Sequence, residues 1–183
     1  MGDMGEATDL PLAVDLDGTL ILTDMSRVTI RRVVLPRFWL FPWLLFLELT
    51  GKRAKWKRIL GRKLKFDPAE LVYNEAFLTW LKEQKANGRE MILCTASEEF
   101  VAQKIADYVG IFDDVMASDG VTNLRMEAKG KALAERYGEG KFAYAGNSSH
   151  DLKTWPFAGE VIVVNASKST LNALGDRPSI VFE

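Results

Sequence analysis

Two aspartates at the end of an apolar run, Asp15 and Asp17, are the residues of this chain best suited to chemistry. They follow the run 12–14 and precede the turn residues Gly18 and Thr19. Alternate side chains of a strand point the same way, so both carboxylates are expected on one face. Such a pair can bind Mg²⁺ through oxygen, and one acid can attack phosphorus while the other moves a proton. The alternative is a strand that ends in an ordinary Asp-Gly turn.

Three later segments carry side chains that such a site needs. One apolar run ends at the hydroxyl of Thr95, Lys129 opens a helical run, and a third apolar run leads into Asn147 and Asp151. In this order the motifs Asp-x-Asp-Gly-Thr, strand-Thr, Lys and Gly-Asn-x-x-x-Asp resemble the haloacid dehalogenase superfamily of phosphohydrolases. The resemblance extends from Leu10 over the rest of the sequence.

The resemblance implies a role for each motif. Asp15 is the expected nucleophile, which forms an aspartyl-phosphate, and Asp17 the acid that protonates the leaving oxygen and then activates water. Thr95 would hydrogen-bond a phosphoryl oxygen, and a lysine would neutralise the transferring group. Lys129 and Lys131 both qualify, and the pattern Lys-Gly-x-x-Leu, which begins at Lys129, favours the first. The neighbours expected to contact substrate are Gly18, Thr19, Ala96, Ser97, Lys131 and Ser148.

The resemblance also implies a Mg²⁺ site, formed by the first and last motifs. Its expected ligands are Asp15, Asp17, Asn147 and Asp151, directly or through water. The superfamily usually has an aspartate where this chain has Asn147. An amide oxygen still suits Mg²⁺, so we expect weaker metal affinity rather than an inactive site. His150, in the same loop, is interpreted either as a solvated bystander or as a contact to the phosphate or leaving group.

The length of 183 residues and the hydrophobic content of 48% predict one α/β domain. Strands are expected near residues 11–16, 90–95, 113–117, 141–145, 160–165 and 179–182, and helices near 69–87, 97–109, 129–138 and 148–155. This alternation predicts a doubly wound, Rossmann-like parallel sheet with helices on both faces. We expect residues 1–9 to be disordered, residues 10–23 and 67–183 to form the core, and residues 24–66 to form a small helical cap.

The expected cap concentrates positive charge. Between residues 27 and 65 there are twelve basic residues and one acid, Glu48, for a formal charge of +11, while the rest of the chain carries −12. Within this segment the apolar run Phe38–Leu47 would be ~15 Å long as a helix, too short to span a bilayer. Aromatic side chains beside Lys and Arg are typical of a helix at an anionic membrane surface. The alternatives are a cap that covers the site and a nucleic-acid partner, which is disfavoured because no reading motif accompanies the charge.

Further segments resemble one branch of the superfamily, the phosphatase domain found amino-terminal to membrane prenyltransferases of the UbiA type. They include Val72–Glu75, Ala117–Gly120, Tyr144–Ser148 and Val163–Ala166. This resemblance implies a cytoplasmic domain, peripheral at the inner face of a membrane, that acts on a polyprenyl-linked sugar phosphate beside a membrane prenyltransferase. The expected function is a Mg²⁺-dependent phosphatase. The competing interpretation is a non-catalytic membrane-docking or regulatory module in which Asn147 marks a decayed site.

Overall fold

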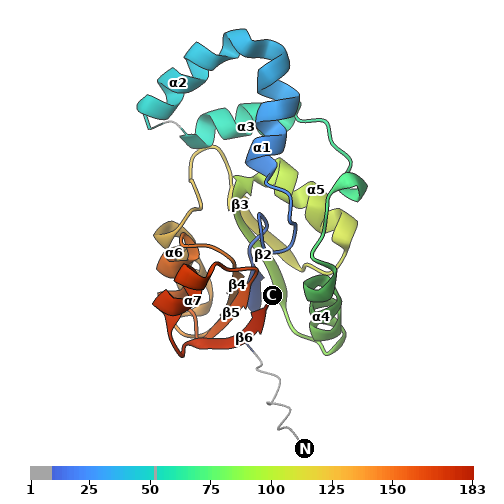
Figure 1. Ribbon diagram of the computed structural model, residues 1–183, viewed down its shortest axis with the longest axis vertical. Helices are drawn as coiled ribbons and strands as arrows, with labels where there is room; N and C mark the ends of the chain where they lie inside the picture. Colours follow the sequence, from blue (N-terminus) through green and yellow to red (C-terminus); the bar gives the residue numbers. More distant parts are fainter. Residues whose placement is uncertain (1–9, 52) are drawn as a thin grey trace, which may run out of the picture.

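A six-stranded sheet forms the centre of the computed structural model, which describes residues 10–51 and 53–183 (Figure 1). Its strands are β1 (Leu12–Val14), β2 (Met91–Glu98), β3 (Asp114–Ser118), β4 (Ala143–Gly146), β5 (Glu160–Val164) and β6 (Pro178–Phe182). Their spatial order is β3-β2-β1-β4-β5-β6, and every neighbouring pair is parallel. This confirms the predicted doubly wound α/β sheet. The segment 1–9, expected to be disordered, lies outside the described residues.

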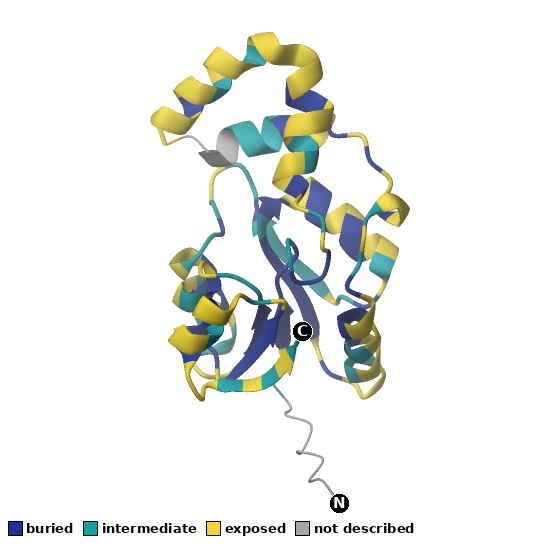
Figure 2. Cartoon of the chain, viewed as in Figure 1, coloured by how far each residue is buried: buried dark blue, intermediate teal, exposed yellow. Residues whose placement is uncertain are grey.

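Successive side chains along the strands point to opposite faces of the sheet and contribute to two apolar clusters, one on each face. In β1, Leu12 and Val14 join one cluster and Ala13 joins the other. The helices that cover these clusters are α4 (Glu75–Ala86) and α5 (Glu99–Val109) on the first, and α6 (Glu127–Tyr137) and α7 (Lys168–Leu174) on the second. Because both faces are covered, the central strands are buried along their length (Figure 2) and read as continuous apolar runs in the sequence.

Three helices differ from the prediction. α4 begins later than expected because the Asn74 side chain caps it by accepting a hydrogen bond from the Phe77 N–H. The helix predicted near 148–155 is wrong. Two 3₁₀ turns, Asp151–Lys153 and Trp155–Phe157, replace it, because the carboxylate of Asp151 accepts backbone N–H groups and competes with helix formation. The third, α7, was not predicted.

The segment 24–66, expected to form the cap, lies beyond the carboxyl ends of the central strands (Figure 1). Its elements are α1 (Met25–Thr29), a π-helical turn (Ile30–Val34), a 3₁₀ segment (Leu35–Leu40), α2 (Phe41–Leu49) and α3 (Arg53–Lys63). Pro36 and Pro42 stand at the starts of the 3₁₀ segment and of α2, where proline is tolerated and a continuous helix is interrupted. α3 packs against α5 and β2, so it lies over the end of β2 that carries Thr95.

Candidate active site

The carboxyl ends of β1, β2 and β4 border one cavity of about 350 Å³. In open α/β sheets ligands bind at this edge. The predicted site residues that line the cavity are Asp15, Asp17, Thr95, Ala96, Ser97, Lys129, Asn147, Ser148 and Asp151. The other lining residues are Asp24, Ser26, Lys57, Arg125, Met126 and His150. The fold therefore brings together residues that lie more than 100 positions apart in the sequence.

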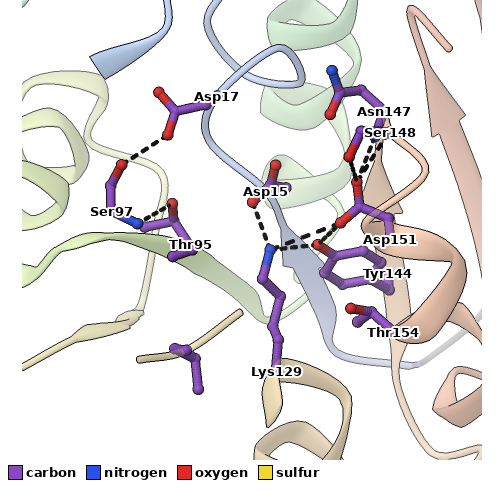
Figure 3. Close-up of polar contacts among 12 residues, drawn as sticks. Asp15, Asp17, Thr95, Ser97, Lys129, Tyr144, Asn147, Ser148, Asp151 and Thr154 are labelled. Atoms are coloured by element: carbon purple, nitrogen blue, oxygen red, sulfur yellow. Dashed lines mark hydrogen bonds and ion pairs between the residues drawn. The ribbon is translucent and has the colours of Figure 1, made fainter. Parts of the chain in front are cut away.

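A buried network joins Lys129 to two aspartates (Figure 3). The Lys129 ammonium donates hydrogen bonds to Asp15 Oδ1 at 2.6 Å and to Tyr144 Oη at 2.7 Å. The Tyr144 hydroxyl in turn donates to Asp151 Oδ1 at 2.7 Å, and Lys129 Nζ lies 3.8 Å from that same oxygen. The network fixes one positive charge at the base of the cavity, between two carboxylates.

Burial sets the ionisation of this network. Desolvation raises the pKa of Asp15 to about 7; the Lys129 ammonium opposes the rise, and the neighbouring Asp151 and Asp17 carboxylates add to it. Burial also acts to lower the pKa of Lys129, but Asp15 and Asp151 raise it above its ordinary value, so the ammonium stays charged. Burial and the nearby carboxylates raise the pKa of Tyr144 well above its ordinary value, which keeps its hydroxyl a donor.

Asp17 lies apart from this network, on the side of the cap (Figure 3). Its Oδ1 accepts the Met25 N–H at 2.7 Å, and its Oδ2 accepts the Ser97 hydroxyl at 2.7 Å. Burial raises the pKa of Asp17, against the two hydrogen bonds, which lower it. A raised pKa favours the protonated carboxyl that an acid catalyst needs. Thr95 is buried beside it, and its hydroxyl accepts the Ser97 N–H at 3.0 Å.

Asp151 organises the loop after β4. Its Oδ2 accepts the N–H groups of Asn147 and Ser148 at 3.2 and 3.0 Å, and the Ser148 hydroxyl at 2.9 Å. With Tyr144 on Oδ1, both oxygens of Asp151 are engaged by protein groups. By contrast, Asp15 Oδ2 and the Asn147 side chain have no hydrogen-bond partner in the described part of the chain. Among the four predicted metal ligands, these are the two that keep a side-chain oxygen not engaged by the described residues.

Three predicted contact residues lie outside the cavity lining. Gly18 has a φ of +83°, and a Cβ at that position would come 2.0 Å from Asn147 Nδ2, so glycine permits the close approach of the two loops. Thr19 is fully buried, and its hydroxyl has no partner among the residues described. Lys131 is exposed and pairs with Glu127 at 2.7 Å. Of the two lysines considered in the sequence, it is therefore Lys129 that reaches the cavity.

A family model described as haloacid dehalogenase-like hydrolase matches residues 12–155, a range that includes the whole Lys129 network. The chain belongs to this family. The matched range covers most of the sequence. It contains the parallel strands β1 to β4 and all the residues that line the cavity. Beyond the matched range, β5 and β6 extend the sheet, and α7 connects them.

This chain is similar to a curated protein and to several solved structures. An uncharacterized protein of Sinorhizobium fredii is 33% identical over 158 residues, which are 85% of this chain and 30% of that protein. This chain therefore spans less than a third of that relative's length. A Bordetella pertussis protein of unknown function has a TM-score of 0.69 at 17% identity and covers 94% of this chain, which in turn covers 97% of it.

A phosphoserine phosphatase in its apo form has a TM-score of 0.64 at 18% identity, over 95% of this chain and 93% of its own. A structure of phosphoserine phosphatase with a phospho-aspartyl intermediate analogue has a TM-score of 0.60 at 19% identity. At these identities the structural matches show the shared fold of the family.

Sequence reasoning missed Tyr144 as part of the site. A tyrosine inside an apolar strand needs a partner for its hydroxyl once it is buried, and that was the available signal. Its partners, Lys129 and Asp151, come from α6 and from the loop after β4, and only the packing of these elements identifies them. The cap residue Lys57 was counted only as surface charge, although it lines the cavity.

Replacement of Tyr144 tests the network. Tyr144→Phe should lower the free energy of unfolding by about 1–3 kcal/mol, because the Lys129 ammonium loses an acceptor and Asp151 loses a donor in a buried setting. Tyr137→Phe is the matched control, since its hydroxyl donates to Glu90 at 2.9 Å in an exposed position where water can replace it. Urea unfolding of the wild type and both variants measures the two changes. Equal changes would contradict the importance of the buried network.

Proposed function

We propose that this family member is a phosphatase that hydrolyses a phosphate monoester through an aspartyl-phosphate on Asp15. The observation that carries the proposal is the buried Lys129 ammonium, 2.6 Å from Asp15 Oδ1, at a cavity that Asp17 also lines. A fixed positive charge beside the nucleophile stabilises the charge of a transferring phosphoryl group. The phospho-aspartyl intermediate named for phosphoserine phosphatase, which shares the fold, supports the same chemistry.

The proposed reaction has two steps. In the first, a carboxylate oxygen of Asp15 attacks phosphorus, the bond from phosphorus to the leaving oxygen breaks, and Asp17 donates a proton to that oxygen. In the second, water attacks phosphorus, Asp17 accepts the proton of the water, and the bond to Asp15 breaks to release inorganic phosphate. Lys129 and the hydroxyl of Thr95 hold phosphoryl oxygens in both steps.

Mg²⁺ is part of the proposal, and the donor groups present fit it. Asp15 Oδ2 and the Asn147 amide offer the hard oxygen ligands that Mg²⁺ prefers. In the described chain no group of three or more His, Cys, Asp or Glu side chains could hold a metal ion. We therefore assign Asp15 and Asn147 as ligands, with Asp17 and Asp151, whose oxygens are engaged by protein groups, acting through water. The bound ion would supply positive charge that reduces the repulsion between carboxylate and phosphate.

Substitution of the two aspartates tests the chemistry. Asp15→Asn should abolish hydrolysis of p-nitrophenyl phosphate in the presence of Mg²⁺, because the amide cannot form the phosphorylated intermediate. Asp17→Asn should slow turnover ~100-fold or more, the usual effect of a lost general acid and base. Asp107→Asn, on the exposed face of α5, is the matched control, and circular dichroism checks the fold. Unchanged turnover by Asp15→Asn would refute the nucleophile, and a wild type inactive on every monoester tested would favour the non-catalytic module.

The metal assignment predicts opposite effects at two positions of the last motif. Asn147→Asp should lower the Mg²⁺ concentration for half-maximal activity roughly tenfold, because a charged ligand replaces a neutral one. Asp151→Asn should raise it, since one amide oxygen cannot replace both carboxylate oxygens, which accept the Tyr144 hydroxyl on one side and the Asn147 N–H on the other. Titration of activity with Mg²⁺ measures both. If neither variant moves the half-saturation point, residues 147 and 151 do not face the metal.

We also propose that the outer side of the cap binds an anionic membrane. Its apolar cap surface consists of Leu35, Phe38, Trp39, Phe41, Leu45, Phe46 and Leu49, each at least 50% exposed. Almost all of α2 is open to solvent (Figure 2). Monomeric proteins rarely expose a large contiguous apolar patch without a binding role. No helix in the described chain combines the length and apolarity needed to cross a bilayer.

Charge complementarity favours lipid as the occupant of this surface. Exposed basic residues accompany the apolar side chains, namely Arg27, Arg31, Arg32, Arg37, Arg62, Lys63 and Lys65. Each Lys or Arg close to an anionic leaflet contributes ~1 kcal/mol. A bilayer offers anionic headgroups together with an apolar interior for the aromatic side chains, so it matches both features of the cap.

A site next to a bilayer suits a phosphate ester that is carried on a lipid. We therefore propose a polyprenyl-linked sugar phosphate as substrate, at the inner, cytoplasmic face of a membrane, with a membrane prenyltransferase as partner. The resemblance of segments such as Val72–Glu75 and Tyr144–Ser148 to phosphatase domains joined to UbiA-type prenyltransferases supports this assignment. The Sinorhizobium fredii relative, of which this chain spans 30%, is long enough to contain further segments.

Liposome binding tests the location. The protein should co-sediment with vesicles that contain anionic lipid, less with neutral vesicles, and weakly at 1 M salt, where the screening length falls to ~3 Å. Trp39→Ala with Trp43→Ala should reduce binding, because fewer aromatic groups enter the interface. The control is Phe100→Ala with Val121→Ala, which removes apolar side chains exposed on the core instead. Failure of the wild type to bind anionic vesicles at low salt would contradict the membrane proposal and leave the phosphatase proposal standing.

A further inference from the structure

Ser97 lines the cavity, but its hydroxyl is already engaged by another side chain (Figure 3). The sequence predicts that this serine contacts substrate. A serine hydroxyl has a single proton to donate, and Ser97 donates it to Asp17 Oδ2 at 2.7 Å. Because Ser97 is buried, water competes little for this hydrogen bond. The contact therefore indicates a role in the orientation of the proposed acid rather than in the binding of phosphate.

The backbone of β2 is irregular at the segment that contains Ser97. The register between β2 and β3 shifts between Cys94 and Glu98, so three residues of β2 lie opposite Ala117 alone. Such a bulge bends a strand and redirects its side chains, and bulges are frequent next to active sites. From this bulged segment the Ser97 hydroxyl reaches Asp17, which lies 80 positions earlier in the sequence.

Two donors orient the Asp17 carboxylate within the described part of the chain. The N–H of Met25, from α1 of the cap, binds Oδ1, and the Ser97 hydroxyl binds Oδ2. The terminal torsion of an aspartate side chain has only a broad intrinsic preference, so a hydrogen bond to one oxygen does not fix the plane of the carboxyl group. Ser97 therefore supplies the core's part of the constraint on Asp17.

Ser97 also contacts the hydroxyl that is proposed to hold phosphate. Its backbone N–H donates to Thr95 Oγ1 at 3.0 Å. Because the Thr95 oxygen accepts this N–H, its own proton stays available for a phosphoryl oxygen. Through its backbone and its side chain, Ser97 thus fixes the position of the acid relative to the group that would bind phosphate.

From these contacts we propose that Ser97 is a positioning residue, which holds the Asp17 carboxyl where the leaving oxygen departs. The inference rests on the proposed phosphatase activity and adds a residue to its first step. In that step Asp15 attacks phosphorus, the bond from phosphorus to the leaving oxygen breaks, and this oxygen keeps the electron pair and takes the proton of Asp17. Proton transfer requires the acid within hydrogen-bond reach of that oxygen, and a small misplacement lowers the rate.

Leaving groups of different basicity test this role. In a series of ring-substituted phenyl phosphates, a nitro group makes the phenolate a weak base that departs without a proton, whereas unsubstituted phenolate needs one. The constant kcat/KM covers the steps up to departure of the phenol. Ser97→Ala should lower it ~10-fold or more for phenyl phosphate, as expected for the loss of a hydrogen bond to a charged group, and much less for p-nitrophenyl phosphate. The slope of log kcat/KM against the basicity of the phenol should therefore steepen.

Three further variants separate positioning from a structural role. Ser118→Ala is the matched control, because the buried Ser118 hydroxyl donates to the Ala96 carbonyl at 2.9 Å, next to Ser97, but does not line the cavity. It should leave the slope unchanged. Ser97→Thr, which keeps the hydroxyl, should retain the wild-type slope, and Ser97→Val, of similar shape, should steepen it. The added methyl groups have room, since Ser97 also lines a cavity of about 30 Å³ between cap and core.

A double-mutant cycle shows whether Ser97 acts through Asp17. In the Asp17→Asn protein, the added Ser97→Ala should leave the slope unchanged, because the acid whose position it disturbs is already absent. A further steepening of the slope in that protein would show that Ser97 acts by another route and would overturn the proposal.

Failure of this role and failure of the proposed function give different results. If the wild type hydrolyses the esters but Ser97→Ala changes the slope no more than Ser118→Ala does, the role of Ser97 alone is overturned. A slope for Ser97→Thr as steep as that for Ser97→Val has the same meaning, since the hydroxyl then makes no difference. If the wild type hydrolyses none of the esters with Mg²⁺ present, the proposed phosphatase activity is overturned, and the role of Ser97 with it.

Discussion

The buried ammonium of Lys129 is the charge on which the arrangement of the site depends. Removal of such a group from water costs several kcal/mol unless partners replace its hydration. Asp15, Tyr144 and Asp151 provide those partners, and they come from the ends of β1 and β4 and from the loop that follows. A stable fold must therefore bring β1, β4 and α6 to the same edge of the sheet. The same contacts that satisfy the buried ammonium place it beside Asp15, the proposed nucleophile.

The two aspartates of the first motif share a strand end but belong to different environments. Asp15 faces the Lys129 network, whereas Asp17 contacts Ser97 of β2 and the N–H of Met25, the first residue of α1. The proposed acid is therefore tied to the element with which the cap begins. Any movement of α1 would change the hydrogen bonding, and with it the pKa, of Asp17. The protonation step proposed for Asp17 would therefore depend on the position of α1.

The sequence was sufficient for the features that local patterns determine. Apolar runs that end in Asp15 and Thr95 predicted parallel strands whose carboxyl ends meet, and the motif around Lys129 selected the lysine that reaches the cavity. It was not sufficient where side chains far apart must meet, as with the Ser97 hydroxyl on Asp17, 80 residues away. The failed helix near 148–155 has a related cause, because the Asp151 carboxylate holds the preceding N–H groups by a side-chain interaction that periodicity does not reveal.

The cap contacts the core on one side and solvent on the other, and its residues differ between the two sides. Toward the core, α3 directs Lys57 to Ala96 and Arg58 to Asp119, so its basic residues are held by backbone carbonyls near the cavity. Away from the core, α2 is almost wholly apolar yet exposed, a combination that is unfavourable in water. A surface that buries α2 would also fix the position of α3, because the two helices pack together. Adsorption of the cap would thus act directly on the wall of the cavity that carries Lys57.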